Sequence, residues 1–452
     1  MDGQTTMRLA LTGDSMITRS AVASRSESVA GLIERIKDAD VAFTNLEVLP
    51  NDFRGYPAVE SGGTHLAAHH RVLDDLVDMG FNLFSCANNH ALDYSIEGLL
   101  ATIEVLEQKE VAYAGIGRTL AQARMPVYLD HEGGSVAMVS CSSTFAKGQS
   151  AGDQRPEVQG RPGLNPLRFG TTYEVTREQL ATLQEIFSAL GLEHQWREWI
   201  QLGFAFPPED PQIFPFLDTN LRSAELLNAR FRAADRPAVK TTPNAQDMEE
   251  IAKWTREARA RADAVLVSLH AHEQDATIED PAEFVRAFAH RVVDEGADIV
   301  VGHGPHLLRG MEIYRGSVIF YSLGNFIAQN ELVHKLPADS YEYFRVGSSK
   351  TPAELFQIRH QNDQKGFPAD KRFWQTIVPV CDFENGRLRR IEVVPVTLDH
   401  GQSVHRRGRP RLAEGEEVGE ILARFAGLSE TFGTKVRHEG DSEASEIAAV
   451  EL

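Results

Sequence analysis

The sequence predicts an α/β protein, and two observations support this fold class. Short apolar runs alternate with amphipathic helical stretches over residues 9–141 and again over residues 248–301. Such alternation is typical of strands and helices that build a sheet with helical layers. A stretch rich in Gly, Pro, Arg and aromatic residues separates the two parts. We interpret it as an insertion, because irregular segments of that length are uncommon unless they serve a function.

Each expected element follows from the local pattern of apolar residues. In the first part, strands are expected at residues 9–12, 41–44, 82–86, 112–113 and 136–141, and helices at residues 29–36, 72–79 and 96–108. Further helices are expected at residues 177–190, 248–262, 284–295 and 414–425, and further strands at residues 264–269 and 298–301. Hairpins are expected at residues 311–321 and 374–396, because Arg315-Gly316 and Asn385-Gly386 are turn sequences.

These patterns divide the chain into a main domain and three other segments. The main domain is expected to comprise residues 1–145 and 246–430. Residues 146–245 are expected to form an inserted cap or substrate-shaping region, and residues 330–373 a second insert. The polar residues 433–452 are expected to form a flexible tail.

The composition argues against several classes of protein. The chain carries 65 acidic and 46 basic residues, a net charge of −19, which argues against nucleic-acid partners and anionic membrane surfaces. Three widely spaced cysteines do not make a disulfide framework. No apolar run reaches the roughly 18 residues of a membrane span, and the N-terminal residues lack the pattern of a signal peptide. We therefore expect a cytoplasmic protein.

Polar residues typical of metal sites directly follow five of the expected strands. They are Asp14, then Asn45 and Glu47, then Asn88, Asn89 and His90, then His270 and His272, and finally His303 and His306. In open α/β sheets, ligands bind at the carboxyl ends of the strands. Residues that lie far apart in the sequence can therefore meet at one point.

The residue types at these strand ends favour a divalent metal. Carboxylate, carboxamide and imidazole groups are ligands of zinc, manganese and iron, and no cysteine is among them. The candidates outnumber the ligands of one ion, so two ions could share them and activate a water molecule. Taken singly, Asp14 or the segment Asn88-Asn89-His90 could be only a helix cap. Their repetition at five strand ends favours the metal site.

The ordered motifs resemble those of the CapA family, the poly-γ-glutamate capsule synthesis group related to calcineurin-like metallophosphoesterases. The resemblance rests on residues 7–145 and 262–328, and includes these segments: Asp14, Asn45-Leu46-Glu47, Asn88-Asn89-His90, His270, Gly302-His303-Gly304-Pro305-His306 and Tyr321-Ser322-Leu323-Gly324-Asn325-Phe326. It implies a calcineurin-like metallophosphoesterase fold, with a central β-sandwich flanked by helices, cap-like inserted segments and a metal centre at strand ends.

The resemblance also assigns roles to individual residues. The implied metal ligands are Asp14, Glu47, Asn89, His270, His303 and His306, which would hold two ions of manganese, iron or zinc. His90 resembles the histidine that protonates a leaving group. From the residues themselves, we expect Asp93, three positions after His90, to orient its ring, and His303 or His272 to be a second proton-transfer group. Expected substrate-binding residues are Asn45, Asn88, Asn325, Arg161 and Arg168; the two arginines could clamp a carboxylate.

The sequence also departs from the patterns of its relatives. Met16 stands where the metallophosphoesterases have a histidine, and Ala271 and His272 stand where many relatives have tryptophan and glycine. Because of Met16, the favoured function is a dinuclear metal-dependent hydrolase of an amide or peptide substrate of γ-glutamyl type. The alternatives are a phosphoesterase, a metal-dependent peptide epimerase, and a non-catalytic accessory protein of poly-γ-glutamate synthesis. The expected partner is a small-molecule or peptide-like substrate, and the sequence makes no prediction of the oligomeric state.

Overall fold

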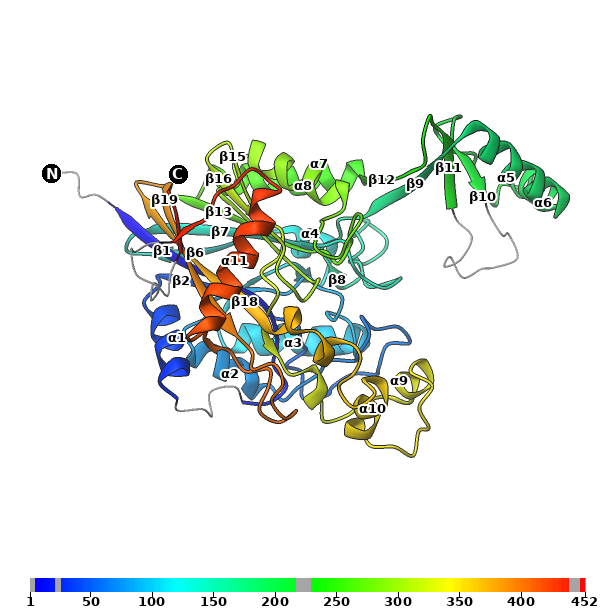
Figure 1. The fold of residues 1–452 in the computed structure, drawn as a ribbon. Coiled ribbons are helices and arrows are strands. Elements are labelled where there is room, and N and C mark those ends of the chain that lie inside the picture. The colour runs from blue at the N-terminus through cyan, green and yellow to red at the C-terminus, as the bar shows by residue number, and fades with distance from the viewer. Residues whose placement is uncertain (1–4, 21–25, 217–228, 439–447, 452) are drawn as a thin grey trace. The chain divides into compact units, whose positions relative to one another are not determined.

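The computed structural model describes residues 5–20, 26–216, 229–438 and 448–451 (Figure 1). The chain divides into two compact units. The first comprises Met1–Leu167, Ala245–Pro281 and Phe288–Leu452, and the second comprises Arg168–Asn244 and Ala282–Ala287. All five strand ends singled out in the sequence belong to the first unit.

The larger sheet of the first unit has ten strands among the described residues. Its main path runs through β21 (Arg437–His438), β22 (Ala448–Glu451), β19 (Arg387–Thr397), β18 (Gln375–Glu384), β1 (Thr6–Met16), β2 (Val41–Asn45), β3 (Leu83–Ser85) and β4 (Ala112–Ala114). β17 (Asn325–Ala328) pairs with β1, and β20 (Arg411–Leu412) pairs with β19. Strands β1 to β4 are parallel, so their carboxyl ends lie at one edge of the sheet.

The smaller sheet of this unit has six strands within the described part of the chain. They follow the order β15 (Met311–Tyr314), β16 (Ser317–Phe320), β14 (Ile299–His303), β13 (Ala264–His270), β7 (Gly134–Ser142) and β6 (Val127–His131). The four inner strands are parallel. The turn between β15 and β16 is tight because Arg315 and Gly316 both adopt positive φ, as the hairpin sequence predicts.

The two sheets pack face to face around one apolar core. Leu11 and Phe43 of the larger sheet belong to the same buried cluster as Met138, Leu266 and Val301 of the smaller sheet. Packed sheets of this kind form a β-sandwich. The expected α/β class with a central sandwich is therefore confirmed.

Helices cover both outer faces of the sandwich (Figure 1). The larger sheet is covered by α1 (Glu27–Lys37), α2 (Arg71–Asp78) and α3 (Ser95–Gln108), whose apolar faces share a second buried cluster with it. On the smaller sheet lies α7 (Ala245–Arg259), which contacts β7 and β13, and α8 (Glu283–Asp294) precedes β14 in the chain. α11 (Glu416–Glu430) packs against β18 and β19. Ser26 caps α1, whose first turn is acidic and last turn basic, so the helix dipole is compensated at both ends.

The second unit has a sheet of its own. Its strands, in sheet order, are β10 (Phe214–Phe216), β11 (Ala229–Ala233), β9 (Phe169–Val175) and β12 (Ala238–Pro243), and its helices are α5 (Arg177–Ala189) and α6 (Leu192–Gln201). The helix expected at residues 177–190 is α5, which begins with a capping box between Thr176 and Gln179. The ring of Phe187 packs 5.3 Å from the rings of both Phe214 and Phe216.

Short elements make up the rest of the first unit. They are α4 (Leu120–Arg124), the strand pair β5 (Ile116–Gly117) and β8 (Gly163–Leu164), and, between β17 and β18, η1 (Asn330–Leu332), α9 (Ala338–Tyr343), α10 (Pro352–Arg359), η2 (Phe367–Ala369) and η3 (Lys371–Trp374). Of the tail expected at residues 433–452, residues 439–447 and 452 lie outside the described residues, and the strands β21 and β22 fall within the remainder. Among the described residues, no helix combines the length and the apolar character needed to cross a membrane.

Candidate metal centre

The carboxyl ends of five strands in two sheets meet at one buried site. In the larger sheet, Asp14 of β1 pairs with Asn45 of β2. In the smaller sheet, His270 of β13 pairs with His303 of β14. Potential metal ligands lie within 4.8 Å of one another in three buried or partly buried groups: Asp14 with His270 and His303, Glu47 with His270 and His272, and Asp14 with Glu47 and His306.

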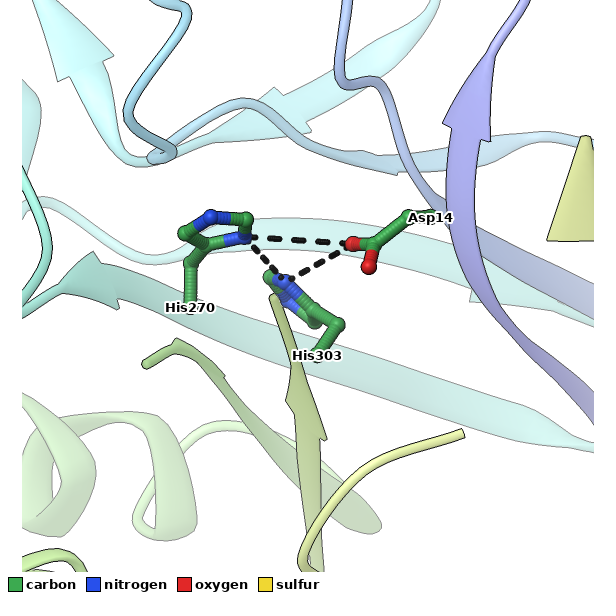
Figure 2. A group of neighbouring side chains, drawn as sticks. All are labelled: Asp14, His270 and His303. Carbon is green, nitrogen blue, oxygen red and sulfur yellow. Dashed lines mark hydrogen bonds and ion pairs between the residues drawn. The ribbon is translucent and has the colours of Figure 1, made fainter. Parts of the chain in front are cut away.

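The first group joins the two sheets. Figure 2 shows Asp14, His270 and His303 pointing toward one another from separate strands. The Oδ1 atom of Asp14 lies 3.8 Å from Nδ1 of His270 and 3.6 Å from Nδ1 of His303, and the two Nδ1 atoms lie 3.0 Å apart. Oδ2 of Asp14 accepts a hydrogen bond of 3.0 Å from the backbone N–H of Gly304. Three potential ligand atoms are therefore positioned around one point.

Glu47 is a buried carboxylate without a hydrogen-bond donor among the described residues. Its side chain is fully buried, and neither Oε1 nor Oε2 has a partner there. Oε1 lies 3.7 Å from Nε2 of His270 and 3.8 Å from Nε2 of His90, whereas Oε2 lies 3.9 Å from Nδ1 of His306. Burial, followed by repulsion from the Asp14 and Asp93 carboxylates, raises the pKa of Glu47 well above its usual value. An uncompensated buried charge is costly, so this position calls for a cation.

The three asparagines at the strand ends have different roles. Nδ2 of Asn45 donates to Oδ1 of Asp14 at 2.8 Å, and Nδ2 of Asn88 donates to Oδ1 of Asn45 at 3.2 Å and to the carbonyl of Leu46 at 2.9 Å. These two residues therefore hold Asp14 and the segment after β2 in place. By contrast, Oδ1 of Asn89 is buried and accepts no hydrogen bond in the described structure. This oxygen is therefore available to bind a metal ion.

Burial sets the charge state of the candidate ligands. It lowers the pKa of His303 to about 3 and that of His306 to about 4, and it lowers the pKa of His270 and His272 well below the usual value. These imidazoles are neutral near pH 7 and keep a lone pair for a metal. Burial also raises the pKa of Asp14 to about 7, although hydrogen bonds from Asn45 and Gly304 oppose the increase.

This set of donors fits divalent cations. It combines two buried carboxylates, neutral imidazoles and a free carboxamide oxygen, which suit zinc, manganese or iron. Glu47 presents its two oxygens to different histidines, His270 and His306. Either carboxylate oxygen could therefore serve as a ligand alongside an imidazole.

A carboxylate–histidine pair lies beside these ligands. Nδ1 of His90 lies 2.7 Å from Oδ2 of Asp93, which also accepts the backbone N–H of Leu66 at 2.7 Å. The ring therefore donates its Nδ1 proton to Asp93, and Nε2 faces Glu47. The sequence had suggested Asp93 as an orienting partner for His90, and the structure brings the two together.

His272 and His306 complete the cluster of histidines. Nε2 of His272 lies 3.1 Å from Nε2 of His270. His306 adopts a positive φ of 63°, which is uncommon for a residue with a side chain. Asn325 holds it at two points: Oδ1 lies 2.9 Å from Nδ1 of His306, and Nδ2 donates to the His306 carbonyl at 3.3 Å. Asn325, expected to bind substrate, thus contacts a candidate ligand directly.

The two arginines expected to bind substrate are exposed. Arg161 donates from its guanidinium to the carbonyl of Ser150 at 3.0 and 3.2 Å. Arg168 belongs to the second unit. The binding of substrate by these two arginines remains a prediction.

Sequence reasoning missed two residues that support the ligands. The sequence places Gly304 only within the motif at residues 302–306, although its backbone N–H donates to Oδ2 of Asp14. Ser268 was regarded only as part of a strand, although its hydroxyl lies 2.7 Å from Nε2 of His303. A signal for Ser268 was present, because it precedes His270 by two positions, and alternate residues of a strand share a face.

Comparison with known proteins identifies the family. Residues 8–330 match the sequence model of the family described as bacterial capsule synthesis protein PGA_cap. The chain belongs to this family, as its motifs predicted. It is 32% identical over 443 residues to the uncharacterized protein y4sH of Sinorhizobium fredii, covering 94% of this chain and 90% of that protein. It is 24% identical over 294 residues to the capsule biosynthesis protein CapA of Bacillus anthracis, covering 65% of this chain and 51% of that protein.

Solved structures show a weaker similarity. A structure described as a novel phosphatase from Mycoplasma pneumoniae aligns with a TM-score of 0.38 and 10% identity, covering 88% of this chain and 96% of that chain.

Proposed function

We propose that this member of the PGA_cap family is a divalent-metal-dependent hydrolase that cleaves an amide bond in a peptide-like substrate of γ-glutamyl type. The observation that carries the proposal is Glu47, a fully buried carboxylate whose two oxygens have no donor among the described residues. A group in that state is stabilised by a cation, and the neighbouring imidazoles are neutral. Metal chemistry therefore accounts for a cluster that would otherwise be costly to fold.

In this proposal, the candidate ligands divide between two positions. Asp14, Glu47 and His306 form one proposed position, and Asp14, His270 and His303 form the other; Asn89 is a further proposed ligand because its buried Oδ1 has no donor among the described residues. Divalent ions held there would supply Lewis acidity, polarising a carbonyl or phosphoryl oxygen of the substrate. Asn45 and Gly304 keep Asp14 oriented through their hydrogen bonds of 2.8 and 3.0 Å.

His90 is the proposed general acid. Its Nδ1 proton is held by Asp93, so Nε2 is the atom that can pass a proton to a departing amine. An amide nitrogen is a poor leaving group unless it is protonated, so a positioned acid contributes directly to cleavage. His272, whose Nε2 lies beside that of His270, is the proposed second proton-transfer group.

Two observations favour an amide substrate over a phosphoester. Met16, which is buried, replaces the histidine of the metallophosphoesterase pattern. Relatives of this chain are named a capsule biosynthesis protein in Bacillus anthracis and a PGA biosynthesis protein in Bacillus subtilis. These names point to the γ-glutamyl class of substrate.

Metal analysis tests the centre itself. Protein purified without chelator or affinity nickel should carry about two equivalents of manganese, iron or zinc, and His306→Ala should lose them. His69→Ala is the matched control, because Asp52, His69 and His70 form a largely exposed group that could take up stray ions. Native protein that holds no metal and takes up none on addition would contradict the proposal. So would metal lost from His69→Ala but retained in His306→Ala.

A substrate panel tests the reaction. Metal-loaded protein is incubated with γ-glutamyl p-nitroanilide, with poly-γ-glutamate and with bis(p-nitrophenyl) phosphate, and products are resolved by mass and chirality. Cleavage of an amide that is lost in His90→Ala supports the proposal. Cleavage of the phosphodiester alone would establish a phosphoesterase, and inverted stereochemistry at unchanged mass an epimerase. Binding of the polymer without turnover of any substrate would establish an accessory role.

A further inference from the structure

A chain of three buried hydroxyls begins at His303 and crosses between the two sheets. Nε2 of His303 lies 2.7 Å from Oγ of Ser268 on β13. Oγ of Ser268 lies 2.9 Å from Oγ of Ser85 on β3, which lies 2.8 Å from Oγ of Ser140 on β7. All three serines are buried, so bulk water does not compete for these hydrogen bonds.

The three serines form one layer beneath the candidate metal centre. Along β13, β3 and β7, the residue two positions earlier on the same face is apolar: Leu266, Leu83 and Met138, all in the core between the sheets. Ser268 and Ser140 are paired neighbours across the sheet. The inward face therefore changes from apolar side chains to hydroxyls one step before the strands reach the site.

The hydrogen-bond geometry at Ser268 indicates which ring nitrogen of His303 carries the proton. A serine hydroxyl has a single proton, and Ser268 donates that proton to Ser85. Ser268 can then only accept from His303, so the proton of the neutral ring must be on Nε2. Nδ1 is left with a lone pair, and it is the atom that lies 3.6 Å from Oδ1 of Asp14 and 3.0 Å from Nδ1 of His270.

We propose that Ser268, backed by Ser85 and Ser140, is a positioning residue that holds His303 in the Nε2–H tautomer and thereby presents Nδ1 to the metal. This inference rests on the proposed metal centre for its purpose, but the tautomer itself is a property of the metal-free protein. A partner that fixes the tautomer and orientation of a ligating histidine raises metal affinity, and its loss typically costs about 10–100-fold.

Ser268→Ala and Ser268→Thr test the role of the hydroxyl. The alanine variant leaves the Nε2–H without an acceptor, whereas threonine keeps the hydroxyl. Binding of Mn²⁺ and Zn²⁺ to the metal-free proteins should weaken about 10–100-fold in Ser268→Ala and recover in Ser268→Thr. Ser429→Ala is the matched control: this buried serine of α11 binds the Phe425 carbonyl and the Met311 N–H, so the variant should lose stability but not metal affinity.

Imidazole ¹⁵N spectra of the metal-free protein give a readout that does not depend on metal binding. Comparison with His303→Asn assigns the ring signals. Native protein should show His303 as a single Nε2–H tautomer, and Ser268→Ala should show a mixture. The inference would be overturned if Ser268→Ala bound metal as tightly as native protein. It would also be overturned if His303 of the native protein carried its proton on Nδ1. If native protein binds no metal, the proposed function fails, while the spectra still decide whether Ser268 fixes the tautomer.

Discussion

The Oδ2 atom of Asp93 lies 2.7 Å from Nδ1 of His90, and both side chains are buried beside the candidate ligands. Because Asp93 also accepts the N–H of Leu66 at 2.7 Å, the carboxylate is anchored to a separate segment of the chain. The ring of His90 is thus held at Nδ1. Its Nε2 atom, 3.8 Å from Oε1 of Glu47, faces the centre and can exchange a proton.

The position of His90 predicts that its substitution slows the reaction without releasing the metal. On the substrate that the panel identifies, His90→Ala should lower kcat by about 10²–10⁴-fold, the usual contribution of a positioned acid or base. Metal content should stay native, because His90 is not among the proposed ligands. Steady-state kinetics together with elemental analysis check both parts. A variant with native kcat would exclude His90 as the acid, and one that loses its metal would make it a ligand.

Glu47→Gln should separate stability from metal binding. The substitution removes the free-energy cost of burying a carboxyl group that must either stay charged or take up a proton, so the metal-free variant should unfold at a higher temperature than metal-free native protein. Its affinity for Mn²⁺ should fall, because a carboxamide is a weaker ligand than a carboxylate. Calorimetric unfolding and metal titration measure the two effects. A less stable metal-free variant would mean that the carboxylate has a stabilising partner in the protein itself.

The close approach of two backbones near Asp14 should make Gly13 intolerant of a side chain. A Cβ at Gly13 would lie 1.8 Å from the carbonyl oxygen of Gly324, a backbone atom that cannot move aside independently. Gly13→Ala should therefore lower the free energy of unfolding by about 1–3 kcal/mol or more, and weaken metal binding by displacing Asp14. Gly419→Ala is the control, because Gly419 lies within α11 with open space around it.

That control should shift stability in the opposite direction. Alanine in the interior of a helix is favoured over glycine by about 0.5–1 kcal/mol, so Gly419→Ala should be slightly more stable than native protein. Urea unfolding measures both variants. Equal stability of Gly13→Ala and native protein would show that β1 and the Gly324 segment lie further apart than the structure places them.

The three buried thiols should make the free energy of unfolding depend on pH. Burial raises the pKa of Cys86, Cys141 and Cys381 above the usual value. The native state therefore keeps these protons at a pH where the unfolded chain, with a thiol pKa of about 8.5, releases them. Their stabilising contribution is complete below that pH and declines above it, by at most about 1.4 kcal/mol per thiol and pH unit.

Urea unfolding between pH 7.5 and 9.5 and a thiol-specific reagent check this prediction. The free energy of unfolding should fall as the pH rises, and less steeply in Cys381→Ala. Native protein should leave all three thiols unreacted at pH 8, whereas denatured protein should react fully. Rapid reaction of one thiol in the native state would show that its strand opens to solvent.

The convergence of the candidate ligands could be predicted from the sequence because it depends on a local pattern. Asp14, Glu47 and His90 each follow a short apolar run, and parallel strands end at a common edge. His270 and His303 likewise directly follow the apolar runs that form β13 and β14. Their positions therefore predicted the part of the site that the smaller sheet contributes. Neither inference required knowledge of which strands pair.

The division into two sheets could not be read from the same pattern. β1 lies between β2 and β18, and β18 follows β1 by more than three hundred residues of sequence. Apolar runs of this length fit one sheet or two equally well, so long-range packing decides. The roles of Asn45 and Asn88 were also hidden, because the backbone after each strand determines whether a carboxamide points to Asp14 or to open space.

The pairing of β1 with β18 also bears on how the chain is made in the cell. Asp14 emerges from the ribosome early, His306 much later, and β18 only after every proposed ligand has been synthesised. Until β18 has been synthesised, the proposed ligands of the nascent chain belong to a β-sandwich that cannot yet form completely. We therefore expect correct metallation to be a post-translational step, so that ion availability at the time of release, rather than during elongation, determines how many molecules mature.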